Sequence, residues 1–454
     1  MLHGSIWDKI PQFALPVAAT AILEQLFNAS DVAVVGNFTG ADRTVAVAAV
    51  GANSPLIGLI VNLFIGIALG TNVVIAHAVG HGNQEDVRRA VHTSVLLALL
   101  GGVLVALAGE LIAAPVLGLL NVPEDVFPLA LLYLRIYLLG MPVILLYNFE
   151  AAIFRSVGET KIPLVALATS GVLNVILNLF FVAVLRMTVN GVAIATVISN
   201  AVSSVLLYRR LRQTTWDIHL EPKLLRIDGT ILKRILRIGL PAGIQSALFA
   251  VSNIVIQSAI NSLGTIVMAA SSAAFNIEII TYDILNSFSQ ACTTFVGQNF
   301  GAGELRRCRK TLLLCIAEGM IVLSAAVAAI LFFGKSLLAI FNSDPEVVET
   351  GYIRLVMVML SHSFSLLYEV MSGYLRGFGI SLVPALLTML GVCGIRIGWI
   401  QLVFPKSRTF QTIMAAYPIS LSATMLLIFL ALLCCRPAKR FAAVQRKEVA
   451  EDAG

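Results

Sequence analysis

The chain has 454 residues, of which 58% are hydrophobic and 12% charged, and its formal net charge is +6. Soluble domains carry roughly 25% charged residues, so this composition, with a mean hydropathy of +0.91, excludes a soluble protein. The 6 cysteines contain no Cys-x-x-Cys spacing, and we expect buried thiols rather than disulfides or metal ligands.

Apolar stretches of about 20 residues, the length that crosses roughly 30 Å of hydrocarbon, recur along the whole chain. We predict that each is an α-helix, because the alternating pattern of membrane β-barrel strands is absent. The expected fold class is therefore all-α integral membrane, with twelve transmembrane helices. The predicted spans are 11–36, 48–76, 90–118, 127–151, 162–186, 189–208, 238–262, 269–297, 311–333, 350–375, 382–404 and 411–434.

Lys and Arg are concentrated in the loops on the side that holds both termini, and Arg155 and Arg376 are counted among these loop residues. By the positive-inside rule we expect a multi-pass protein of the cell (inner) membrane with both termini cytoplasmic. The longest loop on this side, 209–237, ends in the basic segment 231–238. That segment is either an amphipathic stretch on the inner membrane surface or a plain positive-inside linker.

The chain contains an internal repeat, seen most clearly between segments 147–163 and 368–384. The coinciding pairs are Tyr147/Tyr368, Arg155/Arg376, Gly158/Gly379 and Pro163/Pro384. We predict an N-terminal six-helix lobe (1–208), a cytoplasmic basic linker (209–237) and a C-terminal six-helix lobe with a cytoplasmic tail (238–454). An even number of spans in each half makes the repeat parallel, which is a transporter architecture.

Several polar side chains lie within the predicted spans, where ionisable groups are costly and usually functional. Glu24, Asn28 and Asp31 share one face of the first span, and Asn174 and Asn178 share one face of the fifth. Glu278 and Glu369 lie in the eighth and tenth spans and, with Glu24 and Asn28, are predicted to line a substrate cavity. In contrast, we expect Glu110, Glu150 and Glu318 to be solvated near span ends.

Motifs of enzymes are missing from the sequence. Gly334-Lys335-Ser336 resembles the end of a P-loop, but Ala329 occupies the position of its first glycine. There is no HExxH motif, no metal site and no catalytic constellation, so we expect no enzyme activity and no cofactor other than a coupling ion. A polytopic membrane enzyme, which would need such a constellation, is the weaker alternative.

The sequence also resembles the multidrug and toxic compound extrusion (MATE) family, over about residues 10–435. The motifs that carry the resemblance are EQLFNASDVAVVGNF (24–38), VAAVG (47–51), YNFEAAIFRSVGETKIP (147–163), LNVILNLFFV (173–182), GVAIATVIS (191–199), FVGQNFGAG (295–303) and YLRGFG (374–379). The family is similar in having two six-helix lobes and in exporting cationic amphipathic drugs against inward Na⁺ or H⁺.

The resemblance implies a cation-binding site at Asp31, Asn174, Asn178 and Thr196. Asp31 matches the first-helix aspartate that binds the coupling cation in such proteins, while Asn178 replaces an aspartate found in one branch of the family. Phe249 stands where another branch has a glutamate, a role that Glu369 would then take over. A single acid in an apolar bundle favours H⁺ over Na⁺ as the coupling ion.

These observations predict a cation-coupled antiporter that exports cationic amphipathic drugs or toxic metabolites by alternating access. We expect a monomer whose partners are the bilayer and a small-molecule substrate, without nucleic acid. The alternative transporter, a lipid-linked oligosaccharide flippase of the same superfamily, would need a cavity lined with Arg and Lys to hold pyrophosphate. This sequence places more carboxylates than cations inside its spans.

Overall fold

The computed structural model describes residues 1–40, 43–120 and 122–438. Its first half is helical from Lys9 onward, and the fifth span ends in a π-helical turn (η2). The elements of this half are α1 (Lys9–Phe38), α2 (Arg43–His81), α3 (Gln84–Leu119), α4 (Phe127–Leu139), α5 (Met141–Ser156), α6 (Lys161–Leu179), η2 (Phe180–Val184) and α7 (Val189–Gln213).

The second half repeats this plan and carries another π-helical segment (η4) in its own fifth span. The elements are η3 (Pro222–Leu224), α8 (Gly229–Asn261), α9 (Thr265–Gly301), α10 (Leu305–Phe341), α11 (Pro345–Gly377), α12 (Leu382–Thr388), η4 (Met389–Gly394), α13 (Ile395–Leu402), η5 (Phe404–Lys406) and α14 (Phe410–Cys435).

The described residues contain 11 helical segments long and apolar enough to cross a membrane, and the bent pair α4–α5 makes up to 12. All twelve predicted spans coincide with these segments, so the prediction of an all-α membrane protein is confirmed. The pair bends by 49° at Gly140. Pro142 lies two residues later; it has no N–H to donate, and its ring crowds the preceding turn, which explains the break.

The chain divides into two compact units. Unit 1 comprises Met1–Ala18, Gly80–Gly82 and the chain from Leu240 onward, whereas unit 2 comprises Ala19–Val79 and Asn83–Gly239. Helices α1 and α8 therefore each belong partly to one unit and partly to the other. The first ten residues of α1, almost three turns, join the unit formed mainly by the second half of the sequence.

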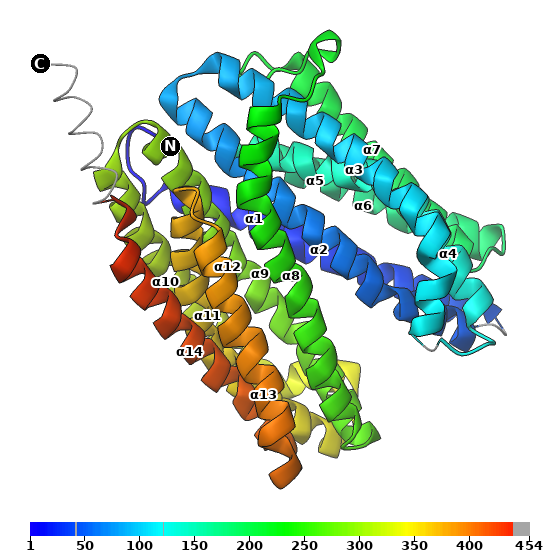
Figure 1. Cartoon of the computed structure of the whole chain (residues 1–454). Coiled ribbons are helices and arrows are strands. Elements are labelled where there is room, and N and C mark those ends of the chain that lie inside the picture. The colour runs from blue at the N-terminus through cyan, green and yellow to red at the C-terminus, as the bar shows by residue number, and fades with distance from the viewer. Residues whose placement is uncertain (41–42, 121, 439–454) are drawn as a thin grey trace, which may run out of the picture. The chain divides into compact units, whose positions relative to one another are not determined.

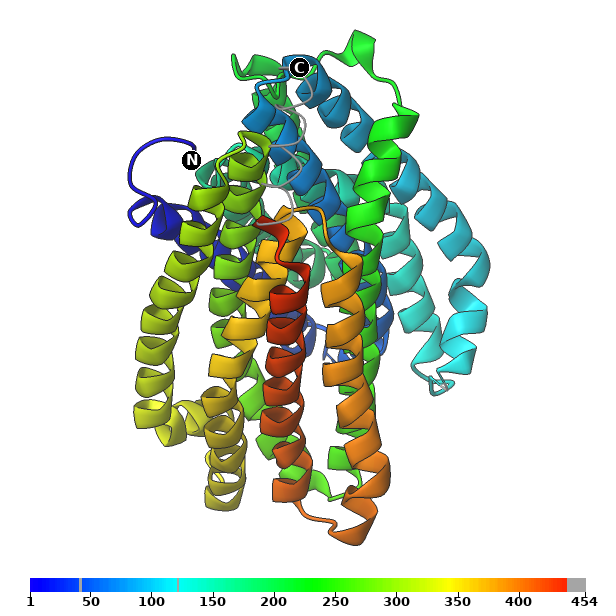
Figure 2. The same cartoon turned by 60° about the vertical axis from the view of Figure 1, so that its left-hand side comes forward.

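In unit 2, α3, α5, α6 and α7 run alongside one another (Figure 1). Their facing sides bury large side chains, among them Phe149 and Phe154, which are fully enclosed. In unit 1, α9, α10, α11 and α14 pack together (Figure 2), and Phe13 of α1 meets Phe295 of α9 edge to face at 6.0 Å. These buried aromatic rings contribute to the packing of each unit.

Large apolar side chains also cover the outside of both units. Leu111 on α3 is 80% exposed and Phe332 on α10 is 82% exposed. Such exposure is unfavourable in water but is expected where a helix faces lipid.

About half of the predicted linker 209–237 is α-helical. Helix α7 continues to Gln213 and α8 begins at Gly229, so the irregular part is 214–228 and includes the short η3 turn. The basic segment 231–238 is the start of α8. Ile231, Ile235 and Ile238 are buried in the core of unit 2, while Lys233 and Arg234 are exposed. The segment is amphipathic, but its apolar face packs on protein.

Candidate functional site

Asp31 lies near the end of α1 in unit 2 and is only 6% exposed. Its Oδ1 accepts a hydrogen bond from Asn178 Nδ2 at 2.5 Å, and its Oδ2 accepts one from Thr196 Oγ1 at 3.1 Å. Asn178 Nδ2 also donates to Asn174 Oδ1 at 3.1 Å. The structure thus brings together the four residues predicted for cation binding. Asp31, Asn174, Asn178 and Thr196 form what we call the Asp31 cluster.

The Thr196 hydroxyl has two acceptors within reach. It lies 3.1 Å from Asp31 Oδ2 and 3.0 Å from the backbone oxygen of Val192, one turn earlier in α7. A hydroxyl carries a single proton, so it donates to one of these oxygens at a time. Thr196 therefore has a local alternative to Asp31 as its acceptor.

Two features of the sequence allow the cluster to form. Asn174 and Asn178 are four residues apart on α6, so their side chains lie on the same helix face. Gly171, one turn earlier, lies so close to α1 that an added Cβ would be 1.8 Å from a ring carbon of Phe27. The absence of a side chain at Gly171 lets α1 approach α6 closely enough for Asp31 to reach both asparagines.

Glu24 and Asn28, the other polar residues of this α1 face, take no part in the hydrogen bonds of the cluster described above. Glu24 is partly buried and lies within electrostatic reach of Arg155, while Asn28 is exposed. Their assignment to a substrate cavity stays a prediction.

Sequence reasoning missed two tyrosines of α4. Tyr133 and Tyr137 stack with ring centroids 6.2 Å apart, and both lie within electrostatic range of Asp31. Their i, i+4 spacing, which places both side chains on one helix face, was the available signal. They place aromatic surface and two hydroxyl groups near the acid.

The two acids predicted for the substrate cavity in the second half each have an arginine neighbour in unit 1. Glu278 on α9 forms a bidentate pair with Arg354 on α11, which donates through Nε at 2.9 Å and through its second terminal nitrogen. Glu369 on α11 lies 3.7 Å from Arg376, the penultimate residue of the same helix. Arg376 lies inside α11 and is 7% exposed, so its assignment to a loop was wrong.

The expectation that three further acids are solvated was wrong for two of them. Glu150 is fully buried and accepts a hydrogen bond from Ser204 at 3.1 Å. Glu318 is 4% exposed, and neither of its carboxyl oxygens has a hydrogen-bond partner among the described residues. Long helices explain the error, because α10 continues well beyond the apolar window that fixed the predicted span. Glu110 is about one-third exposed and lies 3.3 Å from Arg135.

The chain is similar to known proteins along most of its length. The MatE family model matches residues 16–180 and 241–400, one range in each half of the predicted repeat. A probable multidrug resistance protein, YoeA of Bacillus subtilis (strain 168), is 26% identical over 94% of this chain and 93% of its own length. An FAD transporter of Shewanella oneidensis is 23% identical over 75% of this chain and 78% of its own length.

A solved structure with the same fold is the outward-facing conformation of a multidrug resistance MATE family transporter of the MOP superfamily. It aligns with a TM-score of 0.88 at 21% sequence identity and covers 98% of both chains.

Proposed function

Since the chain belongs to the MatE family, whose members are membrane transporters and not enzymes, we propose that it exports amphipathic organic cations in exchange for an inward-moving cation. The observation that carries the proposal is the Asp31 cluster: a buried carboxylate held by neutral donors, with no ion pair to Lys or Arg among the described residues. A buried acid without a basic partner is costly, and such residues in membrane spans mark ion pathways. The multidrug relative supports the same substrate class.

The hydrogen bonds of the cluster favour H⁺ as the coupling ion. Both Asp31 oxygens and Asn174 Oδ1 already accept hydrogen bonds, whereas Asn178 Oδ1 has no partner among the described residues and is not the atom that meets Asp31. A dehydrated Na⁺ needs several free oxygen ligands, but a proton needs one.

Protonation of Asp31 at Oδ2 costs the cluster no hydrogen bond. The new O–H donates to Thr196 Oγ1, and the Thr196 proton turns to the Val192 oxygen 3.0 Å away. Proton binding thereby removes a negative charge and changes the hydrogen bonds that join α1 to α7. Coupling follows if drug and proton differ in affinity for the same two states, which is the condition for exchange by alternating access.

The interior charges of unit 1 support a second candidate, an exporter of organic anions. Glu278 and Glu369 are both matched by arginines, so neither offers a free negative charge to a cationic drug. Arg396 is 6% exposed, donates to Ser420 at 3.1 Å and lies 4.3 Å from the ring of Tyr417, but forms no ion pair with any described residue. The FAD transporter among the relatives carries a substrate with phosphate groups, which a buried guanidinium would attract.

Orientation and assembly complete the proposal. The concentration of Lys and Arg on one side supports cytoplasmic termini in a cell membrane. The cation site lies within one chain, which supports a monomer as the working form.

The deciding experiment is efflux from proteoliposomes, with H⁺ and Na⁺ gradients imposed separately and no membrane potential. The wild type should expel a cationic dye when driven by the pH gradient alone, and Asp31→Asn should not. Glu318→Gln is the matched control, because it also neutralises a buried acid but lies outside the cluster. Efflux by Asp31→Asn at the wild-type rate would overturn the coupling proposal, and efflux driven by Na⁺ alone would overturn the choice of H⁺. Expulsion of an anionic dinucleotide but not the cationic dye would favour the second candidate.

A further inference from the structure

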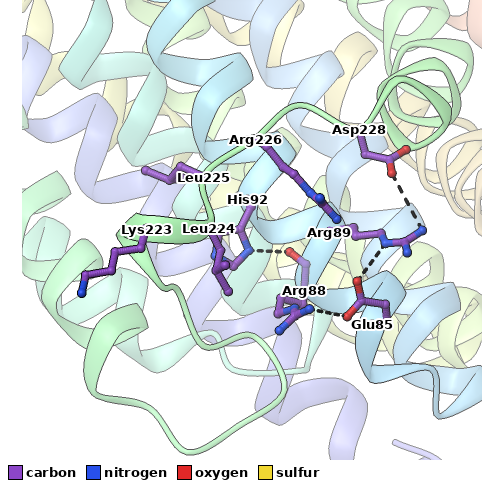
Figure 3. A pocket seen from close by; sticks show the side chains of 9 residues that line it. All are labelled: Glu85, Arg88, Arg89, His92, Lys223, Leu224, Leu225, Arg226 and Asp228. Atoms are coloured by element: carbon purple, nitrogen blue, oxygen red, sulfur yellow. Dashed lines mark hydrogen bonds and ion pairs between the residues drawn. The ribbon is translucent and has the colours of Figure 1, made fainter.

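A basic pocket lies in unit 2, away from the Asp31 cluster. It is formed where the linker crosses the N-terminal end of α3. It is a cavity of about 290 Å³ between the first turns of α3 and linker residues 223–228 (Figure 3). Four basic side chains and two acidic ones line it: Arg88, Arg89, Lys223 and Arg226 against Glu85 and Asp228. The pocket therefore has an excess of positive charge.

The acids of the pocket are engaged with the arginines of α3. Glu85 binds Arg88 at 2.6 Å and Arg89 at 3.0 Å, and Arg89 also lies 3.9 Å from Asp228. Lys223 and Arg226, both exposed, form no ion pair within the part of the chain that the structure describes. The positive charge that is not held in an ion pair therefore comes from the linker.

The linker is held in place on α3 by contacts that do not use these two cations. His92, which is 2% exposed, donates from Nδ1 to the Arg88 oxygen at 2.6 Å and accepts from the Glu221 N–H at 3.1 Å. Thr93 Oγ1 accepts from the Asp228 N–H at 3.0 Å. The pocket is thus preorganised, which lowers the entropic cost of binding a ligand.

The position of the pocket along α3 corresponds to the headgroup region of a bilayer. A helix of 36 residues, the length of α3, extends about 54 Å, whereas the hydrocarbon core is about 30 Å thick. Arg88 and Arg89 lie in the second turn, before the apolar run of the helix begins. They therefore lie beyond the hydrocarbon but close to it.

Exposed apolar side chains on the same linker indicate that it contacts a membrane surface rather than bulk water alone. Trp216 is 46% exposed, Leu224 is 40% exposed and Ile227 is 41% exposed. Leu224 is itself part of the pocket lining, next to Lys223. Tryptophan and aliphatic side chains beside basic residues are typical of segments that contact the lipid interface.

We propose that this pocket binds the phosphate headgroup of an anionic phospholipid, with Arg226 and Lys223 as the cations that meet it. Arg88 and Arg89 form the basic wall behind it, and Leu224 and Ile227 contact the acyl chains. The bound lipid fastens the linker to α3 just before α8 begins. This site is independent of the transported substrate.

The test is native mass spectrometry of the purified full-length protein in detergent, titrated with dioleoylphosphatidylglycerol or with dioleoylphosphatidylcholine. The wild type should retain the anionic lipid in preference to the zwitterionic one. Each basic residue at a membrane surface contributes about a fivefold factor in affinity, so K223Q/R226Q should bind the anionic lipid about 25-fold more weakly. R209Q/R210Q is the matched control, because it removes two exposed cations at the end of α7 that lie outside the pocket.

Three results would overturn the proposal. They are equal binding of the two lipids by the wild type, K223Q/R226Q within threefold of the wild type, and a control variant as weak as K223Q/R226Q. Millimolar glycerol phosphate added as a competitor separates the sources of the phosphate group: unchanged lipid retention supports a lipid site, whereas full displacement assigns the pocket to a soluble anion. If the double variant does not purify, R226Q alone should show about a fivefold loss, and R226K should restore binding.

Discussion

The buried ion pair between Glu278 and Arg354 gives a sharp prediction about stability. The side chains of Arg354 and Glu278 are 3% and 8% exposed, and Arg354 also donates to Ser271 at 2.6 Å. The guanidinium lies 5.5 Å from the ring of Phe275 and 5.7 Å from that of Tyr417. Replacing Arg354 with Met keeps most of its volume but leaves the Glu278 carboxylate buried without its partner.

The magnitude follows from the asymmetry of buried pairs. Removal of one partner strands a charge and costs about 3–5 kcal/mol, whereas replacement of both by apolar side chains is often neutral or stabilising by about 1–4 kcal/mol. We therefore expect Arg354→Met to destabilise the protein strongly. Glu278→Met combined with Arg354→Met should recover most of that loss.

The assay is a double-mutant cycle on the purified protein in detergent, with thermal unfolding of the two single variants, the double variant and the wild type. The single Arg354→Met variant should melt lowest, and the double variant should lie near the wild type. If Arg354→Met costs less than about 1 kcal/mol, Glu278 is not held as a charged partner in the native state. Independent, additive effects of the two substitutions would refute the same reasoning.

Three further predictions concern single acids. Asp31→Asn should abolish gradient-driven efflux at nearly unchanged melting temperature, because the amide oxygen still accepts a hydrogen bond from Asn178. Asp31→Leu should lower the free energy of unfolding by about 1–3 kcal/mol, because it leaves one Asn178 N–H unsatisfied. Equal melting temperatures of the two variants would contradict this reasoning. Glu318→Gln should keep transport and melt no lower than the wild type, since its carboxyl oxygens have no partner in the described chain; a lower melting temperature would show a hidden partner. The N–H of Ile231, then that of Thr230 and the charge of Arg89, hold the pKa of Asp228 below its usual 3.8. Its contribution to stability is therefore present above that value and is lost as the pH falls through the lowered pKa, so the melting difference between wild type and Asp228→Asn should be present at about pH 6 and shrink toward about pH 3.

Much of the fold follows from local properties of the sequence. Twelve spans were placed correctly because a helix in lipid must satisfy its own backbone hydrogen bonds, so an apolar stretch of sufficient length has one outcome whatever its neighbours. Part of the Asp31 cluster could be predicted from the sequence for a related reason. The spacing of Asn174 and Asn178 assigns them to one helix face. Their assignment to a shared site with Asp31 and Thr196, however, came from the family resemblance.

Only the tertiary structure shows which charged side chains are buried and which of them contact one another. Arg376 was assigned to a loop, yet it is buried beside Glu369, and Glu318 was expected in water, yet it is enclosed without a partner among the described residues. Helix ends and pairings between distant helices depend on packing that no local pattern encodes. The same holds for the basic pocket, since His92 and Glu221 are far apart in sequence and meet only when the linker crosses α3. The sequence by itself determined the membrane, the helices and the acid at position 31, whereas only three-dimensional contact determined the partners of each charge, because electrostatic energy depends on distance in space.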